Sequence, residues 1–597
     1  MPGPMRAVNK AKDFKKSTKR LFNYSKKQIV YVVVATILAV LSTVLTLIGP
    51  NKLRDITNII AEPFEIVRNT HVWTGIDVNA ILKIAIFLVV IYGVSALSGY
   101  GQGFLMSGVT QRVSKRMRGD ISKKINRLPL KYLDSTPYGD VLSRVTNDVD
   151  TVSQSLNNSI TTLVSSITLF LGSVIMMFVT NWIMAISAIV SSLIGVGIMG
   201  IVMAKSQKYF KQQQEVLGAL NGQIEEAYSG QTIIKAYNAE REVTEKFVAK
   251  NNELYSSAWK SQFLSGLMGP LMNFVGNFGY VVVCIVGSAL AINGNISFGV
   301  IIAFMVYVRL FTQPLAQMAQ CLTNVQQLVA ASERVFEFLD EKEMSNAEPK
   351  AQLKDVKGEV EFKIVKFGYN PDKTIIHDFS AKIKPGQKVA IVGPTGAGKT
   401  TLVNLLMRFY EIESGEILID GINIQDLSRE NVHDLFGMVL QDTWCFNGTI
   451  KQNIIYSKQG VTDEQVVDAC RECGLHHFIK TLPEGYDTVL SDNTSISAGQ
   501  KQLLTIARAM VQDNPMLILD EATSSVDTRT EVLIQKAMDK LMKGRTTFVI
   551  AHRLSTIKNA DLILVLKDGD IVEKGKHDDL LKQGGFYAEL YNSQFEE

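Results

Sequence analysis

Two long stretches of the chain contain no charged residue and no histidine. They run over residues 151–204 and 261–308. A helix needs about 20 apolar residues to cross the hydrocarbon core of a membrane, so each stretch is long enough for two crossings. Polar residues divide the first stretch at Asn181–Trp182 and the second at Asn293–Asn295. The pattern therefore predicts two pairs of spanning helices, each pair joined by a tight turn.

Two further apolar runs precede these stretches, at Ile29–Pro50 and at Ile84–Ser107. We expect the first helix to end at Gly49–Pro50 and residues 51–79 to form the one sizeable external segment. No small-residue cleavage site follows the first run, so we interpret it as a retained membrane anchor. The predicted total is six spanning helices, of which the last four lie near 158–180, 182–204, 263–292 and 298–322.

Lysine and arginine crowd three polar segments, which are residues 10–27, 112–131 and 205–250. Cytoplasmic loops of membrane proteins carry an excess of these residues. We therefore expect all three segments in the cytosol, and an even number of crossings leaves the C-terminal half there too. The prediction is a multi-pass protein of the cell membrane, the cytoplasmic membrane if the source is a bacterium, with both termini cytosolic.

The two cytosolic connections between these helices mix polar and apolar residues at near-helical spacing. Each is broken once, at Thr136–Gly139 and at Ser229–Gly230. We interpret them as helical extensions with a short crosswise helix at each break, placed to contact another domain. An ordinary loop without such a contact is the alternative.

Charged residues of both signs crowd the region after Glu333, where no long charge-free stretch occurs, and set a soluble half apart from the membrane half. We expect a basic cytosolic segment at 1–28, an all-α transmembrane domain at 29–325, a linker at 326–355 and an α/β domain at 356–597. No Asp or Glu lies in the last four expected helices, whereas ion-coupled carriers usually need an intramembrane carboxylate. The energy for any transport is therefore expected to enter through the soluble half. The net charge of +4 is mild, and we expect no nucleic-acid partner.

A glycine-rich loop follows the apolar run Lys388–Val392 in that half, and its letters match GxxxxGK[ST]. Such a loop turns backbone N–H groups toward phosphate oxygens at the start of a helix. Its lysine can reach the β- and γ-phosphates, and the hydroxyl after it can bind Mg²⁺. The predicted nucleotide-binding residues of this loop and helix are Gly393, Pro394, Thr395, Gly396, Ala397, Gly398, Lys399, Thr400 and Thr401.

A second apolar run, Met516–Leu519, ends in two acidic residues. A carboxylate at the end of such a strand can hold Mg²⁺ or its water shell, and we assign this role to Asp520. The next carboxylate, Glu521, can polarise the attacking water and is the candidate general base. Two unrelated surface acids would be the alternative, but the apolar run before them disfavours it.

Together these features resemble an ABC exporter half-transporter, and the resemblance covers nearly the whole chain. It implies a six-helix transmembrane domain of the exporter fold followed by an α/β P-loop NTPase domain, with ATP and Mg²⁺ as cofactors. It also implies that Tyr369, in the expected strand 362–369, stacks on adenine. Gln441 resembles the glutamine that contacts Mg²⁺, and His552 the histidine that contacts the γ-phosphate.

The segment Ile496–Gln500, with the letters ISAGQ, resembles the LSGGQ signature of this family. The resemblance implies that Ser497, Gly499 and Gln500 contact the ATP of a second subunit. It also implies that residues 524–527 form the D-loop, whose last residue is Asp527. A helix beginning near Gln500 would offer free N–H groups to that phosphate. One chain carries one such cassette, so two half-transporters must pair.

Two departures from the family pattern affect the choice of partner. Ala498 replaces a glycine where backbone approaches phosphate, and residues 489–495 lack the usual GE-x-G run. Lys399, Asp520 and His552 are nevertheless present. The combination resembles the catalytic-glutamate chain of heterodimeric bacterial multidrug exporters. A heterodimer with a second half-transporter is therefore the hypothesis, and a homodimer remains open.

The resulting functional prediction is ATP-driven export of amphipathic, drug- or lipid-like small molecules across the bilayer by alternating access. An importer or a lipid flippase on the same fold is the alternative, as is a channel-type or regulatory ABC protein. A soluble ABC protein would lack the apolar spans, and a secondary carrier would lack the phosphate loop. Fold alone does not determine the cargo.

Overall fold

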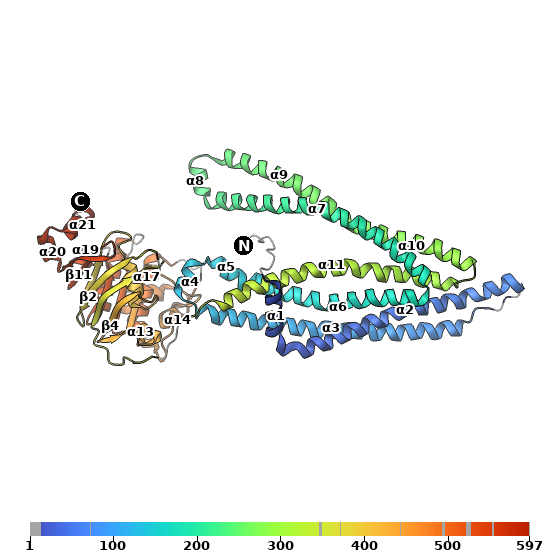
Figure 1. Cartoon of the computed structure of the whole chain (residues 1–597). Helices are drawn as coiled ribbons and strands as arrows, with labels where there is room; N and C mark the ends of the chain where they lie inside the picture. The colour runs from blue at the N-terminus through green and yellow to red at the C-terminus, as the bar shows by residue number, and fades with distance from the viewer. Residues whose placement is uncertain are drawn as a thin grey trace. The chain divides into compact units, whose positions relative to one another are not determined.

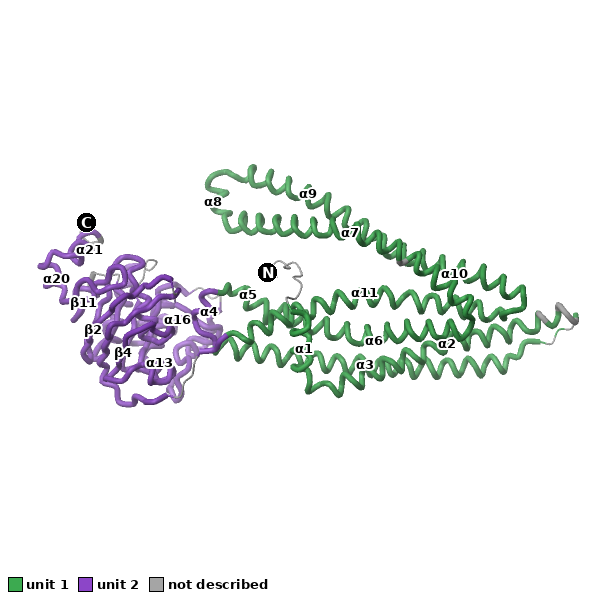
Figure 2. The backbone as a smooth tube through the Cα atoms, viewed as in Figure 1, with its two compact units in different colours: residues 1–127, 136–341 green, residues 128–135, 342–597 purple. Residues whose placement is uncertain are grey.

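The computed structural model describes residues 13–71, 73, 75–344, 349–370, 372–441, 443–491, 496–520, 527–551 and 554–595. The chain divides into two compact units, drawn in different colours in Figure 2. The first comprises residues 1–127 and 136–341, and the second comprises residues 128–135 and 342–597. Each unit has its own core.

Long helices build the first unit, and six segments of its described residues are long and apolar enough to cross a membrane. This confirms the predicted number of spans. The turns at Asn181 and at 293–297 separate helices as expected. The long helices are α2 (Ile29–Thr70), α3 (Val78–Ile125), α6 (Val149–Thr180), α7 (Trp182–Ser229), α9 (Glu240–Gly266), α10 (Met268–Ile292) and α11 (Phe298–Asp340).

Helix α2 continues past Pro50 to Thr70, so the expected end at Gly49–Pro50 is wrong. A proline inside a helix removes one backbone hydrogen bond and costs about 3 kcal/mol. Bonds from α11 hold the continuation in place. The Tyr307 hydroxyl donates to Asn51 Oδ1 at 3.0 Å, and the Gly299 N–H donates to Asn58 Oδ1 at 3.0 Å. Most of the expected external segment is therefore helix.

Short helices lie where the sequence breaks. Helix α8 (Gln231–Ala236) closes the hairpin between α7 and α9, which lie side by side in Figure 1. Helix α4 (Leu130–Ser135) precedes the break at Thr136–Gly139, and α5 (Tyr138–Ser143) and the π turn Arg144–Asp148 follow it. The expectation of a short helix at each break is confirmed.

Helix α11 packs along α6, and α2 packs along α3, as Figure 1 shows. An ion pair joins the N-terminal end of α6 to the C-terminal end of α11, because Arg334 Nε donates to both carboxylate oxygens of buried Asp148, the residue before α6, at 3.1 and 3.0 Å. The first helix, α1 (Phe14–Tyr24), is held against these ends by an ion pair between Arg20 and Asp340. One proline, Pro314, lies buried inside α11.

The second unit is an α/β structure around a six-stranded sheet of order β12-β11-β3-β10-β9-β6. Its strands are β3 (Lys388–Val392), β6 (Phe436–Val439), β9 (Met516–Asp520), β10 (Thr546–Ile550), β11 (Leu562–Lys567) and the antiparallel edge β12 (Asp570–Gly575). A four-stranded antiparallel sheet consists of β1 (Val360–Phe367), β2 (Ile376–Ile383), β4 (Ser414–Ile419) and β5 (Ile422–Asn423), and β7 (Gly448–Thr449) pairs with β8 (Val489–Leu490).

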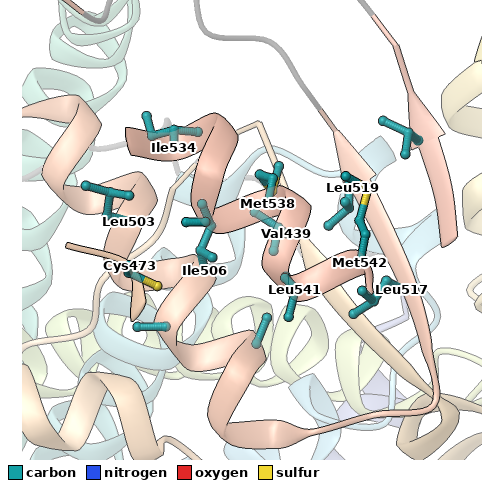
Figure 3. Close-up of a cluster of buried hydrophobic side chains, with 14 of the residues drawn as sticks. Val439, Cys473, Leu503, Ile506, Leu517, Leu519, Ile534, Met538, Leu541 and Met542 are labelled. Carbon is teal, nitrogen blue, oxygen red and sulfur yellow. The ribbon is translucent and has the colours of Figure 1, made fainter. Parts of the chain in front are cut away.

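Alternate residues of the parallel strands face two different cores, as the two-residue period of a strand requires. Val389 and Ile391 pack toward the antiparallel sheet and α12 (Lys399–Leu406). Ala390 and Val392 pack toward the core in Figure 3. The helices of the unit after α12 are α13 (Arg429–Leu435), α14 (Ile450–Ile455), α15 (Asp463–Glu472), α16 (His476–Thr481), α17 (Ala498–Gln512), α18 (Thr528–Met542), α19 (Leu554–Lys558), α20 (His577–Gln583) and α21 (Phe586–Phe595).

The bond between Tyr307 and Asn51 gives a test of the α2 continuation. Replacing Tyr307, whose side chain is fully buried, by Phe removes the donor to Asn51 and keeps the ring. We expect a loss of about 0.5–1.5 kcal/mol, measured as a fall of the thermal unfolding midpoint in detergent. The matched control is Tyr280→Phe, because the Tyr280 hydroxyl makes no hydrogen bond with the described part of the chain. Equal midpoints for the two variants would contradict the role of this bond.

Candidate nucleotide-binding site

The carboxyl ends of four parallel strands meet at one edge of the six-stranded sheet. Strand β10 lies between β3 and β9, and β6 follows β9. The register pairs Ile550 with Ile391 on one side and with Asp520 on the other. In open α/β sheets this edge is where ligands bind. The loop after β3, the acid that ends β9 and the glutamine after β6 therefore share one edge.

The glycine-rich loop runs from Gly393 to Gly398 and leads into α12. Gly398 has a φ of 97° and precedes the helix as its N-cap. A Cβ there would lie 2.8 Å from Ile376 Cδ1, and a Cβ on Gly393 would overlap the carbonyl oxygen of Leu566. Only glycine fits both positions, which explains why the spacing of the motif matters. The loop exposes Pro394, Thr395 and Gly396, whereas Ala397 is buried.

The Lys399 ammonium turns back onto this loop. It donates to the carbonyl oxygens of Gly393 at 2.7 Å and of Pro394 at 3.1 Å. Burial lowers the pKa of Lys399 below its ordinary value, and the negative charge of Asp520 opposes that shift. Two backbone carbonyl groups of the loop therefore hold the ammonium in place. A cation in this position can bind an anion that the loop encloses.

Oxygen ligands suitable for Mg²⁺ lie at the same edge. Thr400 is exposed at the second position of α12, Asp520 ends β9, and Gln441 is exposed just after β6. Mg²⁺ usually binds one or two carboxylates together with phosphate oxygens and water. Among the described residues no cluster of three or more His, Cys, Asp or Glu could hold a metal alone. The donor set therefore fits a Mg²⁺ ion that arrives with a nucleotide.

Tyr369 lies two residues beyond β1, which ends at Phe367, so the expected strand 362–369 was placed two residues too late in the sequence. Its hydroxyl donates to Thr401 Oγ1 at 3.3 Å and accepts from Asn404 Nδ2 at 3.4 Å. The ring therefore stands beside the phosphate-loop helix. Its edge-on neighbour, Tyr410, was not singled out from the sequence. The signal in the sequence that could have indicated Tyr410 was the aromatic pair Phe409–Tyr410, which follows α12.

The signature segment caps a helix. Helix α17 begins at Ala498, two residues before the expected start. Ser497 is the N-cap, where its Oγ accepts from the Gln500 N–H at 3.2 Å, and Gln500 Oε1 accepts from the Ser497 N–H at 2.9 Å. Ser497 and Ala498 are exposed, whereas Gly499 is buried. The helix start is thus open to an external anion.

Other predicted residues have local roles or lie outside the description. Asp527 caps α18, since its Oδ1 accepts from the Thr530 N–H at 2.9 Å, and this bond lowers the pKa of Asp527. Glu521 and His552 lie outside the described residues, as does 524–526. Each follows the end of a parallel strand in the sequence, β9 and β10 respectively.

Two family models match the chain. The ABC transporter transmembrane region matches residues 32–315, and the ABC transporter model matches residues 376–524. A fatty acid ABC transporter ATP-binding/permease protein of Mycobacterium bovis is 45 % identical over 517 residues, which are 86 % of this chain and 82 % of that protein. This chain belongs to the ABC transporter family.

Two further relatives of this ABC transporter chain have different names. An ATP-dependent lipid A-core flippase of Syntrophus aciditrophicus is 35 % identical, covering 87 % of each chain. A probable multidrug resistance ABC transporter ATP-binding/permease protein of Bacillus subtilis is 34 % identical, covering 86 % of this chain and 77 % of that protein. The chain is therefore an ABC exporter half-transporter, a membrane protein whose ATP-binding cassette drives translocation. Half-transporters of this family generally pair.

The position of Lys399 gives a test of the ABC transporter's nucleotide site. Lys399→Met removes the ammonium and keeps an apolar stem. We expect binding of a fluorescent ATP analogue to weaken about tenfold to hundredfold, because hydrogen bonds to charged groups contribute about 1.5–3 kcal/mol. Lys384→Met is the control, since Lys384 is exposed before the opposite end of β3. Unchanged affinity in Lys399→Met would remove the lysine from the site.

Proposed function

We propose that this chain exports amphipathic, lipid-like molecules across the cell membrane by alternating access, as one half of a dimer powered by ATP hydrolysis. The observation that carries the proposal is the combination, in one chain, of six membrane-length helices and a sheet edge that brings together the glycine-rich loop, Asp520 and Gln441. Binding of ATP would close two cassettes on each other, and hydrolysis would separate them. The termini and long helical extensions would lie in the cytosol, in agreement with the Lys and Arg distribution.

The chemistry at the edge follows from the positions of its residues. Backbone N–H groups of 396–400 and the Lys399 ammonium would hold the β- and γ-phosphates, and Tyr369 would stack on adenine. Thr400, Gln441 and Asp520 would hold Mg²⁺, which supplies neutralising charge on the phosphate oxygens.

Glu521 would accept a proton from water while the water oxygen attacks the γ-phosphorus and the bond to ADP breaks. His552 would donate a hydrogen bond to the γ-phosphate.

Two observations favour a lipid-like substrate with an acidic group. The relatives include proteins named for fatty acid transport and for lipid A-core flipping. A groove of about 570 Å³ lies between α7 and α9 beyond the charge-free span, with Val216 and Ala219 on its wall and Lys208, Lys211 and Lys250 beside Glu215 and Glu253. With three ammonium groups against two carboxylates, of which Glu215 lies 3.7 Å from Lys211, the groove has a small excess of positive charge beside its apolar wall, the sign that an anionic amphipath would meet.

Inside-out vesicles containing the transporter test the function directly. With Mg·ATP we expect the lumen to accumulate a fluorescent fatty acid, and a fluorescent amphipathic cation to accumulate less. Glu521→Gln should bind ATP normally but lose about 10²–10⁴-fold in turnover, because it removes the proposed general base.

Three results would count against parts of the proposal. Accumulation only in right-side-out vesicles would indicate an importer. Movement of a labelled lipid between leaflets without entry into the lumen would indicate a flippase. Near-normal turnover of Glu521→Gln would remove that residue from catalysis.

We further propose that the partner is a different half-transporter. Ala498 stands at the exposed start of α17, where a partner's γ-phosphate would approach the backbone, and its methyl group narrows that approach. The ATP bound by this chain's phosphate loop would then contact an unaltered signature on the partner. The ATP bound by the partner would contact ISAGQ and would be hydrolysed slowly.

Expression of the chain alone tests the heterodimer. We expect slow ATP hydrolysis by the purified homodimer, and faster hydrolysis when Ala498→Gly restores the usual signature glycine. Ala509→Gly, in the buried part of the same helix, is the control for nonspecific effects of glycine. Robust turnover by the unmodified homodimer, with no gain from Ala498→Gly, would overturn the heterodimer.

A further inference from the structure

Helix α4 belongs to the second compact unit although the chain on either side of it belongs to the first. Leu130, at its first position, packs against the core of the antiparallel sheet. Near its other end, Asp134 accepts a hydrogen bond from the hydroxyl of Tyr410. Asp134 is exposed, whereas Tyr410 is only 9 % exposed. This is a specific polar contact between a buried tyrosine and a short surface helix.

The Tyr410 ring also contacts the predicted adenine side of the site. Its centroid lies 4.9 Å from that of Tyr369 with an interplanar angle of 86°, and 5.7 Å from that of Phe367. The Phe367 and Tyr369 rings lie 5.0 Å apart. Edge-to-face contacts of this kind have a defined geometry, so a shift of the Tyr369 ring changes the packing of Tyr410.

The backbone around Tyr410 is firmly held. Arg408 is buried, and its Nη1 donates to the carbonyl oxygens of Ile424 at 3.0 Å and Leu427 at 2.7 Å. Glu411 accepts from Arg408 Nε at 3.1 Å and from Arg429. These bonds hold the residues on both sides of the Phe409–Tyr410 pair. The Tyr410 side chain therefore has little freedom to change its position when a neighbouring ring moves.

The protonation state of Tyr410 supports its hydrogen bond to Asp134. Burial raises the pKa of Tyr410 above its ordinary value, and the hydrogen bond to Asp134 raises it further. The phenol is therefore protonated at physiological pH and acts as the donor to a carboxylate. A hydrogen bond to a charged acceptor is stronger than one between neutral groups.

We propose that Tyr410 is a positioning residue that links occupancy of the nucleotide site to helix α4, through its ring contact with Tyr369 and its hydrogen bond to Asp134. The inference rests on the proposed function, because it takes Tyr369 as the adenine contact. Bound adenine fixes the Tyr369 ring, the fixed ring holds Tyr410, and Tyr410 holds α4. Coupling between two sites is reciprocal, so α4 in turn influences nucleotide affinity.

Hydrogen exchange of the full-length transporter in lipid nanodiscs tests this link, with the partner chain present if the dimer requires one. A non-hydrolysable ATP analogue should slow amide exchange in residues 130–135 by at least about fivefold in the wild type. In Tyr410→Phe and in Asp134→Ala the slowing should fall below about twofold, while the analogue's affinity changes by less than about fivefold. The double variant should behave like either single one, because both remove the same bond.

A matched tyrosine provides the control. Tyr486 lies in the same unit, and its hydroxyl lies 2.8 Å from His476 Nδ1 in the helical part. Tyr486→Phe should leave the nucleotide-dependent slowing at 130–135 intact, which separates the link from a general loss of stability. If Tyr410→Phe fails to fold, Asp134→Ala decides, since the Asp134 side chain is exposed and not part of a core.

The outcomes separate this link from the proposed function. Wild-type protein that binds the analogue without a change at 130–135 overturns the link, as does full slowing in Tyr410→Phe or Asp134→Ala. Wild-type protein that binds no analogue contradicts the proposed function instead. Affinity is measured on the same samples, so the two failures are distinguishable.

Discussion

Burial of the parallel strands on both faces is the constraint on which the nucleotide site depends. Val389 and Ile391 face one core, and Ala390 and Val392 face the other, all at most 2 % exposed. A slip of one residue would exchange the two sets between cores of different shape. The register is therefore fixed, and the loop that follows β3 begins at a fixed point. Apolar packing therefore sets where the elements of the site begin, and hydrogen bonds such as those of Lys399 and Tyr369 act within that frame.

The phosphate loop shows how a site for an anion can be stable without one. Lys399 is partly removed from water, and its ammonium is satisfied by two loop carbonyl groups. Phosphate oxygens would replace these weak acceptors with charged ones, which form stronger bonds. Lys399 thus has hydrogen-bond partners both with and without a bound phosphate. The exchange of carbonyl groups for phosphate oxygens favours binding of the phosphate.

Local patterns of sequence explain what could be predicted. The spans follow from runs of apolar residues, and the loop 393–400 follows from glycine at positions where a Cβ would collide. The contacts that were missed join residues far apart in the chain. Helix α2 continues past Pro50 because of Tyr307, which is 256 positions away from Asn51. Asp134 and Tyr410 are 276 positions apart. Spacing within a motif contains no information about such pairs.

Two of the predicted catalytic residues, Glu521 and His552, remain predictions, because they lie outside the described residues. What the structure adds is the position of the strands that precede them in the sequence. Asp520 ends β9 in register with Ile550 of β10, so these two strands end side by side at the same edge of the sheet, which the sequence alone could not establish.

The buried Pro314 gives α11 a point at which the helix can bend. Proline removes one hydrogen bond of the helix ladder and is a common place for a helix to bend. Asp340 ends the helix 26 positions after Pro314. At about 1.5 Å per residue this is an arm of about 40 Å, so a bend of about 5° moves its tip by about 3.5 Å. The helix can therefore act as a lever that amplifies a small angular change beside the membrane into a displacement as large as a side chain.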